Sequence, residues 1–206
     1  TTLKFIKMHG LGNDFVIFDT RNASIELSAL QTQTIADRRR GIGCDQVILL
    51  EKSRKGGDIM MRIRNADGGE VEACGNAARC ISQLIMNEKG LNHATIETLS
   101  SLLKTSKVAT GIRVDMGPPY TQWQDIPLTT EMDTSSLEIT EGALSNPVAV
   151  GVGNPHAVFF VKNANKIDLE TLGPIIEHHE FYPNRTNVDV AEIISRNHIR
   201  LRVWER

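Results

Sequence analysis

A cysteine at the start of a predicted helix is the residue of this chain best suited to acid–base chemistry. Residues 65–80 read NADGGEVEACGNAARC, a cluster of turn formers, a short strand and then a helical run that closes at Gly90. Cys74 falls at the N-terminus of that helix, where unpaired N–H groups and the helix dipole favour a thiolate. The same N–H groups can bind a ligand carboxylate. Cysteine statistics alone favour a buried structural residue, but the surrounding pattern favours a reactive thiol.

Short strands and a few helices must position this cysteine. A helix begins at the capping box of Ser28 and Gln31 and extends to about Arg39. A second helix covers residues 168–178. Gly117-Pro118-Pro119 interrupts the pattern and predicts two domains, 1–117 and 118–206. We expect strands over residues 3–8, 14–19, 46–50, 58–64, 94–99, 108–116, 147–152, 157–161, 188–194 and 198–204.

Three short stretches recur in the same order along the chain. GLGN ending at Asn13 resembles GVGN ending at Asn154, an offset of 141 residues. CDQVI at 44–48 resembles VDVAE at 188–192 with an offset of 144, and MRIR at 61–64 resembles IRLR at 199–202 with an offset of 138. These matches predict duplicated halves. The counterpart of Cys74 would fall near position 214 by this repeat, so we expect a truncated second half without its helix and thiol.

Composition excludes several classes of function. A net charge of −2 and a pI near 6.3 give no electrostatic footprint for nucleic acid or an anionic membrane. No apolar run reaches the length of a membrane span, and the N-terminus lacks a signal-peptide pattern. Cys44, Cys74 and Cys80 have no disulfide-scaffold or zinc spacing, which predicts reduced thiols in a cytoplasmic protein. The adjacent His178 and His179 point differently, so no metal site is expected.

Six motifs resemble those of the diaminopimelate epimerase family over nearly the whole chain: MHGLGNDFVIFD, GIGCDQ, RIRNADGGEVEACGNAAR, GNPHAVFFV, PNRTNVD and VWER. The resemblance implies an α/β (α+β) fold of two pseudo-symmetric halves, each a curled, mostly antiparallel sheet around a central helix. It implies a homodimer of the lysine and cell-wall pathway that interconverts LL- and meso-diaminopimelate. Two thiols exchange the α-proton in this family, without pyridoxal phosphate, metal or another cofactor.

The resemblance also implies roles for individual residues. Cys74 would be one catalytic thiol, and His156 and Glu205 would adjust thiol ionisation. Taken singly, the asparagines are ordinary turn residues, but the repeat-related placement of two of them favours a functional reading. Amide groups both donate and accept, which suits a substrate with two carboxylates and two ammonium groups. The implied substrate contacts are Asn13, Gln46, Asn65, Gly75, Asn76, Asn154, Asn187, Glu205 and Arg206.

Two departures from the family pattern leave alternatives open. Ala77 stands where the family has glycine, which is compatible with a helical turn of negative φ. The family's second cysteine loop, ACGTG, is missing from these residues. A proline racemase-like isomerase and a binding module or inactive truncated fragment are therefore alternatives. Cys80 is expected in the core, Cys44 is given no role, and residues 38–40 (RRR) are interpreted as a solvated helix end.

Overall fold

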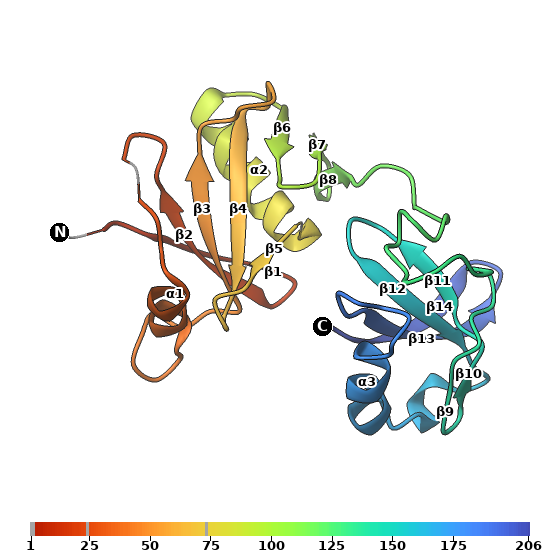
Figure 1. The fold of residues 1–206 in the computed structure, drawn as a ribbon. Coiled ribbons are helices and arrows are strands. Elements are labelled where there is room, and N and C mark those ends of the chain that lie inside the picture. Colours follow the sequence, from red (N-terminus) through yellow and green to blue (C-terminus); the bar gives the residue numbers. More distant parts are fainter. Residues whose placement is uncertain (1–2, 24, 73) are drawn as a thin grey trace. The chain divides into compact units, whose positions relative to one another are not determined.

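The structure is a computed structural model that describes residues 3–23, 25–72 and 74–206 (Figure 1). The chain divides into two compact units, one up to Met116 and one from Gly117 to Arg206. We refer to them as unit 1 and unit 2. None of the helices in the described ranges is long and apolar enough to cross a membrane.

Unit 1 is built on one mixed sheet in which most neighbouring strands are antiparallel. The β2–β3 and β4–β6 pairs are parallel, and the short β5 (Glu70–Val71) pairs with β4. The strand order is β1 (Ile6–Gly10), β2 (Asn13–Asp19), β3 (Gln46–Glu51), β4 (Ile59–Asn65), β6 (His93–Glu97), β7 (Leu102–Val108) and β8 (Gly111–Asp115).

The helix α2 (Gly75–Lys89) covers the inner face of this sheet (Figure 1). Its apolar stripe, including Ile81 and Ile85, packs with the strands in one buried cluster. Cys74 is its N-cap, and Gly90 closes it with a left-handed φ of 66°. Both predicted ends of this helix are therefore confirmed. The shorter α1 (Ala29–Ala36), which begins with the predicted capping box at Ser28, packs on the opposite face.

Unit 2 has a sheet of the order β11 (Val148–Gly151), β12 (Pro155–Phe160), β13 (Asn187–Ser195) and β14 (His198–Trp204). The helix α3 (Leu169–Glu177) and the 3₁₀ turn η1 (Ala164–Lys166) pack on one face of it. A small hairpin of β9 (Thr140–Glu141) and β10 (Leu144–Ser145) lies beside α3.

The strand pairings reproduce the internal repeat. The first three steps across each sheet, β1 to β4 and β11 to β14, are antiparallel, parallel and antiparallel. Phe15 pairs with Gln46 and His156 pairs with Asn187, so both partners are 141 residues apart. Gln46 is therefore the structural counterpart of Asn187. The predicted offsets of 144 and 138 were wrong, since the pairings give 141 for the third strand and 140 for the fourth.

Two predicted elements also differ from the structure. The helix α1 ends at Ala36 rather than near Arg39, because Asp37 leaves the helical conformation and its carboxylate accepts the N–H groups of Arg39 and Arg40. The strand predicted over residues 108–116 corresponds to the shorter β8 at residues 111–115, and β7 at residues 102–108 was not predicted as a separate strand.

Candidate active site

Three polar residues of unit 1 lie at one edge of its sheet. Asn13 and Gln46 begin the parallel strands β2 and β3, and Asn65 ends the antiparallel β4. Starts of parallel strands and the end of an antiparallel neighbour share one sheet edge. Gln46 lies opposite Asn65 in the register, and its Nε2 donates to Asn65 Oδ1 at 2.9 Å. The pairing therefore gathers residues that are far apart in the sequence.

Cys74 is next to this edge. Its Sγ accepts a hydrogen bond from the Ala77 N–H at 3.5 Å and another from Asn13 Nδ2 at 3.8 Å. Donors to sulfur favour the thiolate, as does the helix N-terminus. Cys44 and Cys80, by contrast, are 2% and 5% exposed, and burial raises the pKa of each thiol. Of the three thiols, only the half-buried Cys74 has surroundings suited to acid–base chemistry.

The first turn of α2 is built for close approach. A Cβ on Gly10 would lie 3.2 Å from the Asn76 carbonyl oxygen, a tighter contact than most side chains make, so glycine favours the close approach of β1 to the helix. A Cβ on Gly75 would lie in ordinary contact with Met116 Sδ, at 3.7 Å. Asn76 Oδ1 accepts from the Arg79 guanidinium. Ala77 is buried within the helix and has no positive φ, which confirms that alanine fits where the family has glycine.

Two acceptors at this edge are buried without a hydrogen-bond partner among the described residues: Asn13 Oδ1 and Gln46 Oε1. A buried acceptor that stays unpaired costs about 1–3 kcal/mol. Each amide already uses its NH₂ group within the protein, one toward Cys74 and one toward Asn65. Both amides can therefore accept from a cationic donor such as an ammonium group.

Unit 2 has a polar edge at the equivalent end of its sheet. His156 is its centre, with Nδ1 at 2.7 Å from Asp189 Oδ2 and Nε2 at 3.1 Å from Asn154 Oδ1. Asn187 Nδ2 lies 3.2 Å from the same Nε2, and Asn187 Oδ1 accepts the backbone N–H of Arg206 at 2.9 Å. The structure thus brings Asn154, His156, Asn187 and the backbone of Arg206 together.

The backbone of Arg206 orients the Asn187 amide beside His156. The backbone N–H of Arg206 can only donate, so the oxygen of the Asn187 amide faces it and the NH₂ group faces the histidine. Nε2 of His156 therefore lies between the NH₂ group of Asn187 and the Oδ1 oxygen of Asn154, while Nδ1 faces the Asp189 carboxylate.

Asp189 was missed as a site residue by the sequence interpretation. It is 5% exposed, and its carboxylate orients His156. The signal was an acid within the otherwise buried strand sequence NVDVA, because a buried carboxylate requires a polar partner. Glu205, expected near the thiols, is exposed. The Arg206 guanidinium donates to the Asn184 carbonyl at 2.8 Å.

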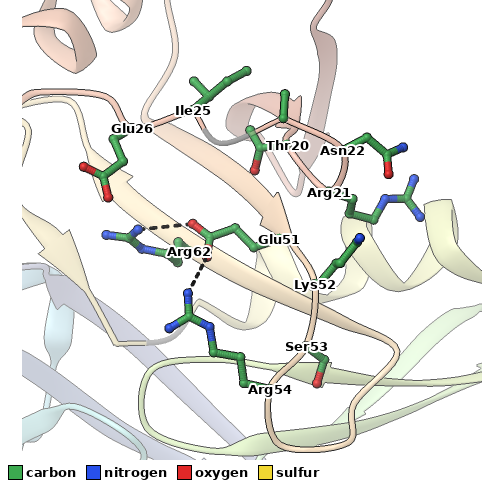
Figure 2. A pocket seen from close by; sticks show the side chains of 11 residues that line it. Thr20, Arg21, Asn22, Ile25, Glu26, Glu51, Lys52, Ser53, Arg54 and Arg62 are labelled. Carbon is green, nitrogen blue, oxygen red and sulfur yellow. Dashed lines mark hydrogen bonds and ion pairs between the residues drawn. The ribbon is translucent and has the colours of Figure 1, made fainter.

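A cavity of about 510 Å³ in unit 1 contains none of the predicted site residues (Figure 2). Glu51 and Arg62 meet across it at 3.1 Å, and Arg62 also binds Glu70 at 2.8 Å. Arg21 forms ion pairs with Asp19 and with Glu88. None of the three cysteines and none of the amides gathered at the strand ends lines this cavity, so it is not the candidate active site.

Over most of its length, the chain is similar to the proteins of one family. The family profile described as diaminopimelate epimerase matches residues 5–122 and 148–206. Diaminopimelate epimerase from Rhodospirillum centenum is 48% identical over 98% of this chain and 70% of its own length. The Sphingopyxis alaskensis protein of that name is 50% identical over 98% of this chain and 74% of its own. A phenazine biosynthesis protein of the PhzF family from Enterococcus faecalis has a similar fold, with 15% identity and a TM-score of 0.58 over 94% of this chain and 67% of its own.

Proposed function

Because this chain belongs to the diaminopimelate epimerase family of cofactor-independent isomerases, we propose that Cys74 exchanges a proton with the α-carbon of diaminopimelate. The observation that carries this proposal is the position of its sulfur. It caps a helix N-terminus, it receives donors from Asn13 and Ala77, and it is the one thiol of the three that is not buried in a core. A thiolate in such surroundings can act as a base, and the thiol as an acid.

The helix N-terminus also suits the reacting carboxylate. Removal of an α-proton develops negative charge that spreads onto the adjacent carboxylate. Preorganised N–H donors at that position stabilise the transition state, each by about 3 kcal/mol. Gly75 and Asn76 supply backbone N–H groups of the first helical turn. In this proposal, the unpaired acceptors of Asn13 and Gln46 receive an ammonium group of the substrate.

Inversion at carbon needs a base on one face and an acid on the other. We propose a second thiol as the partner of Cys74, with one sulfur ionised while the other is protonated. Cys44 and Cys80 are buried, and burial raises the pKa of each, so the partner is neither of them. The two thiols would titrate as a coupled pair.

The polar edge of unit 2 supports a role in binding the same substrate. Asn154 and Asn187 present amide groups to Nε2 of His156. Arg206 can bind a carboxylate bidentately. We propose that these residues, with Asn65 and Glu205, contact substrate, and that His156 and Glu205 adjust thiol ionisation.

Two further proposals rest on the family resemblance. The protein would be a homodimer in the cytoplasm, where its three cysteines stay reduced. Units 1 and 2 would be its two domains, with a boundary at residues 117–118. Sedimentation equilibrium would measure the mass of the assembly, and a monomer at micromolar concentration would contradict the dimer.

The function is tested with the complete gene product that carries these residues, supplied with LL-diaminopimelate in deuterated water. NMR should show loss of the α-proton signal and appearance of the meso isomer. Proline serves as the comparison substrate, because it lacks the distal carboxylate and ammonium groups. Equal turnover of proline, or no exchange with diaminopimelate, would contradict the proposal.

A further inference from the structure

The ends of β2 and β3 that carry Asn13 and Gln46 are held together by two aspartates. Asp14 N–H donates to Asp45 Oδ2 at 2.9 Å, while Asp45 N–H donates to the Asp14 carbonyl and to Asp14 Oδ1, each at 3.0 Å. Each aspartate is the sequence neighbour of a site amide. A shift between the two aspartates would therefore change the spacing of the two amides.

Arg38 holds both carboxylates at once. Its Nη2 donates to Asp14 Oδ1 at 2.7 Å and to Asp45 Oδ1 at 2.8 Å, and its Nη1 donates to Asp14 Oδ2 at 3.1 Å. Lys7 Nζ adds a further ion pair to Asp14, at 2.7 Å. Two adjacent carboxylates repel each other, so the guanidinium is what allows them to bind each other's backbone. Arg38 lies in the turn that follows α1. The Asp37 carboxylate in this turn accepts backbone N–H groups rather than the Arg38 guanidinium, so the guanidinium is left to bind at the ends of β2 and β3.

We propose that Arg38 is a positioning residue that fixes Asn13 and Gln46 at the site edge by clamping the two aspartates. This inference rests on the proposed function, because both clamped amides are proposed to bind substrate and the Asn13 amide also donates to Cys74. Their geometry matters because a misplacement of about 1 Å can cost roughly 100-fold in rate. Unit 2 has no such clamp, since Pro155 and Thr186 occupy the equivalent positions.

The clamp has an electrostatic signature. Hydrogen bonds from Arg38 are the largest contribution that lowers the pKa of Asp14 well below its usual range. Hydrogen bonds from Lys7 and Asp45 lower this pKa further. His9 lies opposite Asp14 on β1, and the Cys44 thiol is also close enough to interact. Loss of the guanidinium would leave Asp14 with Lys7 as its cationic partner and bring its protonation to a higher pH.

The first test measures Cys74 directly and needs no substrate. The rate of alkylation by iodoacetamide is measured as a function of pH. The rate measured with Cys74→Ala, which reports any reaction of the buried thiols, is subtracted. In Arg38→Gln, displacement of Asn13 should weaken its hydrogen bond to the sulfur, which shifts the alkylation profile to higher pH. Arg38→Lys should restore part of the shift. Arg39→Gln and Arg40→Gln are matched controls, because those side chains are exposed and lie outside the clamp.

The second test measures turnover in the complete gene product. Arg38→Gln should lower kcat/KM for diaminopimelate about 10- to 100-fold, with a new acid limb in the pH profile from the protonation of Asp14. Thermal melts would identify a variant that loses only stability. An unshifted alkylation profile in a folded Arg38→Gln variant would overturn the clamp. Absence of turnover in the unaltered protein would instead contradict the proposed function and leave the alkylation result standing.

Discussion

Units 1 and 2 share a strand plan but differ in what occupies the inner face of each sheet. By the pairing offset of 141 residues, Phe15 and Ile48 of unit 1 correspond to His156 and Asp189 of unit 2. The first pair is fully buried under α2, while the second is a hydrogen-bonded polar pair. The same backbone frame therefore supports an apolar core in one unit and a polar hydrogen-bonded network in the other.

The two units also differ in how deeply the side chains on this face of the sheet are buried. Ile59 and Ile63 on β4 are fully buried against α2, but their counterparts Ile199 and Val203 on β14 are 56% and 41% exposed. The helix α3 packs on the opposite face, as α1 does in unit 1. Among the described residues, the same strand pairings therefore carry a buried face in unit 1 and an exposed face in unit 2.

The largest expected effect on stability concerns two isoleucines that occupy equivalent positions in the two units. Ile59→Ala removes a fully buried side chain and should destabilise the protein by about 2–5 kcal/mol. Ile199→Ala, the same substitution at the exposed counterpart, should cost about 0.5 kcal/mol or less. Urea unfolding of both variants measures the difference. Equal costs would mean that the face of β14 is as buried in solution as that of β4.

Acid should weaken unit 1 before unit 2. Lys89 and the Thr95 N–H lower the pKa of Asp58, and donors from residues 53–55 lower that of Glu97. A depressed folded pKa gives stability that is present above the unfolded value, 3.8 for aspartate, and lost as the pH falls below it. In unit 2, Asp133 is the one described carboxyl group with a lowered pKa.

Amide hydrogen exchange resolved by residue, measured from pH 7 to pH 3, compares the two units in the same sample. Protection in β4 and β6 should fall first, and Asp58→Asn should remove part of that pH dependence. Simultaneous loss of protection in both units would show that these carboxyl groups do not set the acid stability of unit 1.

The smallest expected effect concerns the first turn of α2. Ala77 is buried and helical, so Ala77→Gly should destabilise the protein by about 1 kcal/mol. The helix needs no glycine there, since Ala77 adopts no positive φ. A thermal melt would detect the change, and a stabilised variant would show that this turn is strained by alanine.

Local signals in the sequence were sufficient to predict the helix whose N-terminus carries Cys74. The N-cap Cys74, the apolar stripe and the C-cap Gly90 are all short-range features, and the structure confirms each. The gathering of Asn13, Gln46 and Asn65 at one edge was expected from the family resemblance but had no local signal, because it depends on the parallel pairing of β2 with β3 across an intervening helix.

Charged residues were the hardest to interpret from sequence. Residues 38–40 read as a solvated arginine run, and Arg38 is indeed 57% exposed, yet its guanidinium bridges two aspartates. Asp189 gave no motif of its own, although it orients His156. In both cases the partner lies on another strand or turn, so only the tertiary register reveals the role.

The proposed role of Cys74 is tested most directly by α-proton exchange in deuterated water with Cys74→Ala in the complete gene product. Inversion of diaminopimelate should be abolished while the variant stays folded, with Cys80→Ala, a substitution in the core cluster, as the cysteine control. Inversion by Cys74→Ala at the rate of the unaltered protein would show that Cys74 is not a catalytic thiol.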